Sequence, residues 1–88
     1  MYFLTYSNQV IEKDLPKLSS SAKSLIKLTI EKKLLTDPVK FGKPLRYNLK
    51  GCRSLRVSDY RVIYQIVETT INVLVIRHRR DCYSENKL

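Results

Sequence analysis

The sequence predicts a small α+β domain in the order β-α-α-β-β-β, with an antiparallel sheet and a helical hairpin packed on one of its faces. The chain has 88 residues, of which 43% are hydrophobic, so it can bury one modest core and should form a single domain, 1–88. Apolar residues recur at helical spacing over residues 7–37. Residues 52–80 instead show the composition and alternation of strands, with only short interruptions.

The N-terminal part is expected to hold one strand and two helices. Residues 2–6 are aromatic and β-prone, which favours a short strand. A first helix follows directly, and Pro16 should end or kink it because proline disfavours helical geometry in the residue before it. A second helix is expected over residues 19–37, where serines offer an N-cap, an apolar stripe follows one face, and an Asp-Pro step ends the pattern.

The second half carries three strand signals. Residues 38–51 hold two of the three prolines and both glycines, so a loop or an irregular arm is expected there. Strands are expected over 52–57, 60–67 and 71–80, and the breaks between them are of hairpin length. They should form a consecutive antiparallel meander. The helices must cover one face, because a sheet so rich in Val, Ile and Leu cannot expose both faces to water.

The positive charge is unevenly distributed. The formal net charge is +9, and residues 38–80 hold ten Lys or Arg residues against two acidic ones. Charge that served solubility alone would be mixed in sign and evenly spread. A basic surface of this density attracts polyanions, of which nucleic acid is the most common, so the composition predicts a nucleic-acid partner.

Other features exclude several classes of protein. No run approaches the roughly 18–20 apolar residues of a membrane span. The first residues do not resemble a signal peptide, so no membrane association and a cytoplasmic location are expected. Cys52 and Cys82 should then remain reduced. Together with His78 they lack the paired spacing of a zinc site, so no metal and no other cofactor are expected.

The arginines of the expected meander are candidates for a binding site. Because side chains alternate along a strand, Arg56, Arg61 and either Arg77 or Arg79 could converge on one basic concavity. Guanidinium groups bind phosphate oxygens in pairs, so such a concavity suits phosphate. The alternative is that each arginine extends along the surface or pairs weakly with an acid, but the basic block offers only two acids.

Tyr83 and His78 follow or end the last expected strand. Tyr83 could stack on a base or transfer a proton, or simply pack against the sheet edge. His78 could act as a general acid or base, although lone histidines are more often structural and alternation puts it opposite Arg79. No Ser-His-Asp set, paired carboxylates or glycine-rich phosphate loop is visible. An enzyme with this sequence would therefore depend on electrostatic stabilisation.

Two stretches carry a family resemblance when they are taken together. "LKGCRSLRVSDYRVIYQI" combines a Leu-Lys-Gly step, a basic strand and a Tyr-Arg step, and "VLVIRHRRDCY" is an apolar strand ending in His-Arg and a tyrosine. "KDLPKL" and "LLTDPVKFGKPL" upstream also fit. In this order and at these spacings, the sequence resembles the RelE branch of the RelE/ParE toxin superfamily from about Tyr2 to Tyr83.

The resemblance implies a compact microbial ribonuclease that is the toxin of a type II toxin–antitoxin pair. Such toxins enter the ribosomal A site, beside the 16S rRNA, and inhibit translation by cutting mRNA there. A ribose 2′-hydroxyl attacks the adjacent phosphate and leaves a 2′,3′-cyclic phosphate and a 5′-hydroxyl. The resemblance also implies a co-expressed RelB-like antitoxin, commonly acidic or amphipathic, that wraps over the toxin and holds it inactive.

The family's functional residues can be carried over to this chain. Arg61 and Arg79 match arginines that bind and stabilise the scissile phosphate, with Arg80 as an alternative to Arg79. Tyr83 matches the tyrosine that orients or stacks on RNA and assists proton transfer, and His78 is a further candidate for proton transfer. The residues expected to contact RNA phosphates more widely are Lys50, Arg53, Arg56, Arg77 and Arg80.

The sequence departs from the family pattern at the expected general base. Some members have two lysines on the strand before the Tyr-Arg step, whereas Cys52 and Ser54 stand at these positions. His78, Tyr83 or Lys50 could serve instead, or the site relies on arginine electrostatics and the ribosome. Two other functions therefore stay open: a ParE-like toxin that binds DNA gyrase without cutting RNA, and a catalytically weakened toxin that only binds its antitoxin.

Overall fold

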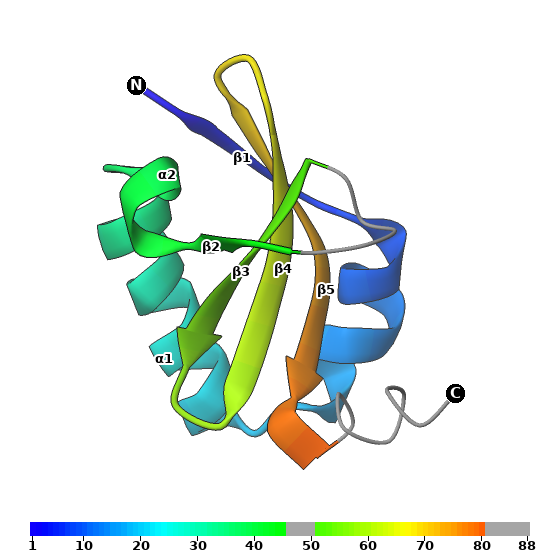
Figure 1. Cartoon of the computed structure of the whole chain (residues 1–88). Coiled ribbons are helices and arrows are strands. Elements are labelled where there is room, and N and C mark those ends of the chain that lie inside the picture. Colours follow the sequence, from blue (N-terminus) through cyan, green and yellow to red (C-terminus); the bar gives the residue numbers. More distant parts are fainter. Residues whose placement is uncertain (46–50, 81–88) are drawn as a thin grey trace.

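The computed structural model describes residues 1–45 and 51–80 and confirms the predicted α+β fold. One sheet contains five strands in the spatial order β1-β5-β4-β3-β2 (Figure 1). The strands β3, β4 and β5 form the expected antiparallel meander, and β1 lies parallel to β5. The strands are β1 (Phe3–Tyr6), β2 (Lys43–Pro44), β3 (Cys52–Val57), β4 (Tyr60–Val67) and β5 (Thr70–His78).

Two helical segments form the predicted hairpin after β1. The first consists of η1 (Val10–Asp14) and η2 (Leu15–Lys17), and it tightens and ends around its proline as expected. The second consists of α1 (Ser20–Thr29) and η3 (Ile30–Leu34). The N-cap of α1 is Ser19, whose hydroxyl accepts the Ala22 N–H at 3.2 Å.

The segment expected to be an irregular arm is more regular than predicted. A short helix, α2 (Pro38–Phe41), begins three residues after the end of η3 and is followed by β2, which pairs with β3. The Asp37 carboxylate accepts the Lys40 N–H at 3.0 Å and so caps α2. The sequence does hold this signal, because an acceptor at the N-cap followed by proline at the first helical position marks a helix start.

The hydrophobic core lies between the helices and one face of the sheet, here called the inner face. Both helical segments and all three strands of the meander contribute to it. Each strand presents alternate side chains to this layer, as a half-buried sheet requires. The core residues are Val10, Ile26, Ile30, Leu34, Leu55, Val57, Val62, Tyr64, Ile71, Val73 and Ile76.

A β-bulge in β5 determines which side chains of its second half face the core. Ile63 pairs with Val75, but the next residue of β4, Tyr64, pairs with Val73, so Leu74 is an extra residue in β5. An unbroken alternation would place Arg77 on the same face as Val73. The bulge shifts the alternation by one residue. Ile76 therefore enters the core, and Arg77 moves to the opposite, outer face.

Two side chains replace the missing strand partner beside the bulge. The ladder between β1 and β5 ends at Val73, and the Ser7 hydroxyl then donates to the Leu74 carbonyl at 2.7 Å. Farther along, the Asp14 carboxylate accepts the Ile76 N–H at 2.9 Å, although Asp14 is only 6% exposed. A buried backbone N–H is costly when it has no acceptor. Asp14 thus joins η1 to the shifted half of β5.

We expect Asp14→Ala to lower the free energy of unfolding by about 1–3 kcal/mol, because the buried Ile76 N–H loses its acceptor. Glu12→Ala is the matched control: Glu12 is exposed on the same helical turn, and its replacement should change stability by less than about 0.5 kcal/mol. Urea denaturation followed by circular dichroism measures both values. Equal stability of the two variants would contradict the role assigned to Asp14.

Candidate functional site

Three arginines stand side by side on the outer face of the sheet. Arg56 pairs in register with Arg61, and Arg61 pairs in register with Arg77, so β3, β4 and β5 each contribute one member to this arginine row. Directly opposed side chains in antiparallel strands are about 5 Å apart at Cβ, and like charges there are destabilising. Such an arrangement is favourable when an anion lies over it.

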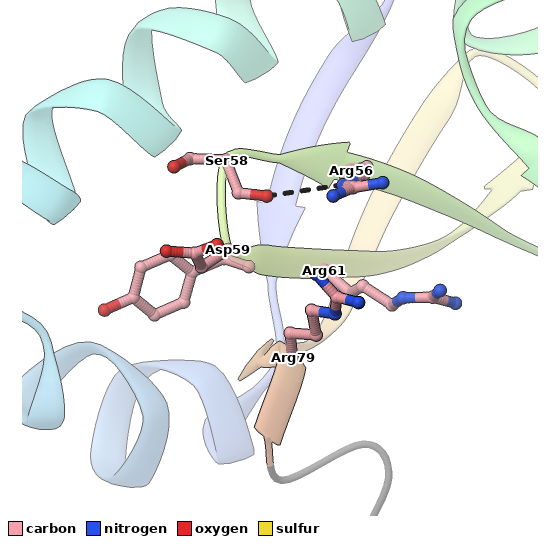
Figure 2. Close-up of a pocket in the computed structure, with 6 residues that line it drawn as sticks. Arg56, Ser58, Asp59, Arg61 and Arg79 are labelled. Carbon is pink, nitrogen blue, oxygen red and sulfur yellow. Dashed lines mark hydrogen bonds between the residues drawn. The ribbon is translucent and has the colours of Figure 1, made fainter.

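A pocket lies at the end of this row, beside the turn between β3 and β4 (Figure 2). Figure 2 shows that Arg56, Arg61 and Arg79 gather on one side of this turn. The pocket has a volume of about 50 Å³, against the roughly 10–15 Å³ that one water needs. This volume is large enough for a group the size of a phosphate. Its lining residues are Arg56, Ser58, Asp59, Tyr60, Arg61 and Arg79.

The turn itself holds two of these arginines in place. Ser58 has a positive φ of 54°, in the left-handed region that suits the first residue of a tight hairpin turn. Its carbonyl accepts a long hydrogen bond from Arg56 Nε at 3.5 Å. The next carbonyl, of Asp59, accepts the Arg79 backbone N–H at 2.6 Å. The turn thus fixes the end of β5 next to the start of β4.

The last expected strand ends two residues earlier than predicted. It ends at His78, and Arg79 and Arg80 begin a helical turn. Arg79, in this turn, lines the pocket together with Arg56 and Arg61. His78 pairs with Tyr60 on the inner face, where the two rings meet edge-on with centroids 5.2 Å apart. The structure therefore does not bring His78 into the arginine row or the pocket lining.

Arg53 lies away from the arginine row, on the inner face of β3. Its guanidinium donates to the carbonyls of Val39 and Gly42 at 2.6 and 2.7 Å, so it holds α2 and the residue after it against the sheet. Tyr64 helps, because its buried hydroxyl donates to the Pro38 carbonyl at 2.5 Å. Burial raises the pKa of Tyr64 above its ordinary 10.0, although the Arg53 guanidinium opposes this, so the hydroxyl keeps its proton.

The close packing around Tyr64 also explains one glycine. A Cβ added at Gly42 would overlap the Tyr64 hydroxyl, so only glycine allows the chain to pass here. Arg53, expected among the RNA-contacting residues, instead contacts the backbone of α2 and of the residue after it. The one hint was that strand alternation separates Arg53 from Arg56.

Comparison with known proteins shows which family this chain belongs to. Residues 5–83 match a family model described as the ParE toxin of the type II toxin–antitoxin system parDE. The chain belongs to the RelE/ParE toxin superfamily. It is 42% identical over 52 residues to toxin RelG of Mycobacterium tuberculosis, and 40% identical over 55 residues to toxin RelE of the same organism. These alignments cover 57% and 60% of this chain, and 60% and 57% of the two relatives.

Solved structures agree in fold over nearly the whole chain. A chain of the M. tuberculosis toxin–antitoxin complex RelBE2 superposes with a TM-score of 0.77 at 31% identity, covering 89% of this toxin and 98% of that chain. The isolated E. coli RelE toxin gives a TM-score of 0.74 at 25% identity, with 98% and 95% covered. The toxin is thus a type II toxin–antitoxin toxin with the RelE-like architecture.

The departure from the family pattern can be located in this toxin. Cys52 and Ser54 lie on the outer face of β3, in register with Gln65 and Ile63, and Cys52 is buried. Neither residue lines the pocket. Lys50 and Tyr83, both expected at the site, lie outside the described residues. Within the described parts of the toxin, no cluster of His, Cys, Asp and Glu could hold a metal ion, and no helix is long and apolar enough to span a bilayer.

Arginine replacements on the two faces of β3 should differ in how strongly they affect stability. Arg53→Gln should lower the free energy of unfolding by about 1.5–3 kcal/mol, because two carbonyls lose a charged donor. Arg56→Gln, three residues along the same strand, should change it by less than about 0.5 kcal/mol, since Arg56 is exposed. Urea denaturation of both variants tests this, and a larger loss in Arg56→Gln would refute it.

The arginine row and pocket should bind inorganic phosphate weakly. Each kcal/mol by which bound phosphate stabilises the folded state raises Tm by about 4–8 °C in a domain of this size, so phosphate should raise Tm measurably over chloride at equal ionic strength. Arg61→Gln should lose most of this rise. Lys23→Gln, which removes one exposed positive charge on α1, should retain it. An identical phosphate effect in both variants would show that net charge, and not this site, is responsible.

Proposed function

We propose that this toxin is a ribosome-dependent endoribonuclease that cuts mRNA in the ribosomal A site and so inhibits translation. The observation that carries the proposal is the phosphate-sized pocket surrounded by Arg56, Arg61 and Arg79. The identity to RelE-type toxins supports the same conclusion. No cofactor is needed, because the attacking group belongs to the RNA.

The proposed reaction develops negative charge on the phosphate, and the pocket that would hold it is lined by positively charged arginines. The ribose 2′-oxygen attacks the neighbouring phosphorus, the bond from phosphorus to the 5′-oxygen breaks, and a 2′,3′-cyclic phosphate and a 5′-hydroxyl result. Negative charge increases on the phosphoryl oxygens as the new bond forms. Fixed guanidinium groups stabilise that charge more than the ground state, which accelerates the reaction. We assign this role to Arg61 and Arg79.

Flanking phosphates would lie along the remaining basic surface. Arg56 is at the edge of the pocket, and Arg77 extends the arginine row across β5. Arg80 begins the helical turn next to Arg79. Contacts with phosphates fix the register of a nucleic acid without reading its bases. We therefore propose that these three arginines hold the mRNA backbone, or the 16S rRNA beside it, while Arg61 and Arg79 act on the scissile group.

The proton transfers fall to groups other than the arginines. The proton of the 2′-hydroxyl must leave, and the departing 5′-oxygen must gain one. Among the described lining residues, Asp59 carries the one carboxylate, and Figure 2 shows it extending away from the three arginines. Tyr83 and Lys50 are the candidates that we retain, with the ribosome as the further source of a base.

We also propose a RelB-like antitoxin as the partner that silences the toxin. Chains with this fold occur in the RelBE2 complex of M. tuberculosis and in the intact RelBE complex of E. coli. An acidic or amphipathic antitoxin would complement the basic outer face. A toxin that acts on ribosomes and is held by such a partner works in the cytoplasm.

A second candidate is the inhibition of DNA gyrase in the manner of ParE. The family model matching residues 5–83 is named after ParE, which is the observation in its favour. A supercoiling assay with purified gyrase separates the two candidates. Inhibition of supercoiling, together with intact mRNA in a translation extract, would replace the ribonuclease proposal by this one.

The ribonuclease proposal is tested by primer extension on a defined mRNA in a bacterial translation extract, with and without ribosomes. The wild-type toxin should produce cuts inside codons only when ribosomes are present. Arg61→Ala and Arg79→Ala should each lower the cleavage rate by about 10²–10³-fold, as expected when a preorganised transition-state contact is lost. Tyr83→Phe tests the retained candidate for proton transfer.

Lys23→Ala serves as the control, because it removes a positive charge remote from the pocket lining and should cleave like wild type. Undiminished cleavage by Arg61→Ala would refute the role of the arginine. Intact mRNA with every protein would refute the activity and leave an antitoxin-binding module.

A further inference from the structure

The side chain of His78, next to the pocket, makes two contacts within the protein that the proposed reaction does not require. His78 is the last residue of β5, and its Nδ1 accepts the backbone N–H of Arg80 at 3.1 Å. The ring also meets the Tyr60 ring edge-on, at an interplanar angle of 81°. Tyr60 lines the pocket and His78 does not, so His78 supports the pocket wall from the inner face.

The hydrogen bond to Arg80 has the pattern of a helix N-cap. His78 precedes the helical turn, and its side chain accepts the N–H of the second residue inside that turn. N-cap residues accept from this position or the next one and thereby satisfy a donor that the helix leaves open. Asparagine is among the preferred N-caps. Its Oδ1 and the Nδ1 of histidine are both bonded to Cγ, so the two acceptors occupy similar places.

We infer that His78 is a positioning residue, whose imidazole caps the turn after β5 and thereby carries Arg79 into the pocket. For its effect on cleavage, this inference rests on the proposed ribonuclease function. Arg79 is fixed from two sides: its own N–H donates to the Asp59 carbonyl at 2.6 Å, and the next N–H donates to His78. Loss of the second bond would loosen the turn that carries Arg79, even though the bond to the Asp59 carbonyl remains.

The same geometry opposes a direct part in proton transfer. An Nδ1 that accepts a hydrogen bond must be unprotonated, so the neutral ring carries its proton on Nε2. Taking up a proton at Nδ1 would break the cap. The arginine row lies on the outer face, whereas His78 shares the inner face with Val57 and Tyr60. The position that sequence reasoning assigned to acid–base work thus acts through Arg79.

Three replacements of His78 separate the two roles. His78→Asn keeps an acceptor on Cγ, His78→Gln moves the amide one carbon farther out, and His78→Leu removes it. No variant retains a group that titrates near neutral pH. At a saturating concentration of ribosomes, the His78→Asn variant should cleave mRNA within about two-fold of the wild-type rate, because asparagine is a strong N-cap. The His78→Gln and His78→Leu variants should cleave about ten-fold more slowly, which equals about 1.4 kcal/mol.

The wild-type and Asn proteins should also share one profile of cleavage rate against pH between about 7 and 8, because a positioning residue takes no part in the proton transfers that set this profile. An Asn variant as slow as the Leu variant would overturn the inference and make His78 an acid or base. So would an Asn variant whose pH profile is flattened in this range.

A measurement on the free toxin keeps the inference separate from the proposed function. Nitrogen-15 NMR should find the Nε2-protonated tautomer of His78, and the Arg80 amide should exchange more slowly in wild type and Asn than in Leu. Equal exchange in wild type and Leu would overturn the cap, whatever the cleavage assay gives. A protected Arg80 amide in a toxin that leaves mRNA intact would instead refute the ribonuclease and leave the cap in place.

Discussion

The distribution of the β5 side chains between the two faces of the sheet depends on one extra residue in this strand. The strand has to bury Ile71, Val73 and Ile76 and yet turn Arg77 outward, which a period of two does not allow. The bulge at Leu74 resolves this conflict by shifting the alternation. It also disturbs the ladder, and the Asp14 carboxylate supplies the acceptor that the shifted half of β5 lacks on the side of β1. A buried carboxylate in η1 thus satisfies a backbone donor in the half of β5 that turns Arg77 outward.

The two arginines of β3, Arg53 and Arg56, have different roles. Arg53, on the inner face, donates hydrogen bonds to two backbone carbonyls and so holds α2. Arg56, three residues later, lies in the arginine row on the outer face. The first use stabilises the fold because the charged donor has defined acceptors. The second use opposes it, because neighbouring guanidinium groups repel one another. The core on the inner face must offset that repulsion, and the resulting field is what an RNA phosphate would meet.

Much of this fold was predictable, because its signals are local. The meander followed from strand composition and short breaks, and the helical hairpin from apolar spacing, serine caps and Pro16. The bulge was not predictable, because residues 73–76 are all apolar and show no alternation whose shift could be seen. Asp14 left a weak signal: it lies four residues after the buried Val10, on the helical face that packs against the sheet.

The candidate site was predictable in its residue types more than in its geometry. Sequence reasoning found the arginines of the meander, since a block rich in one charge is visible without a structure. It extended β5 to residue 80, whereas the strand ends at His78, because local propensity does not reveal a carbonyl of a distant turn that accepts the Arg79 N–H. The separate place of Arg53 also depends on α2, which a Pro- and Gly-rich segment had concealed.

The size of the pocket bears on how such a toxin would choose its target. A volume of about 50 Å³ accommodates a phosphate. Its described cations are arginines, which recognise the charge and shape of a phosphate that every nucleotide carries. If the proposed function holds, the described site therefore stabilises the transition state but contributes little sequence specificity. Selection of the cleaved bond would have to come from the ribosome, which presents one codon in one conformation.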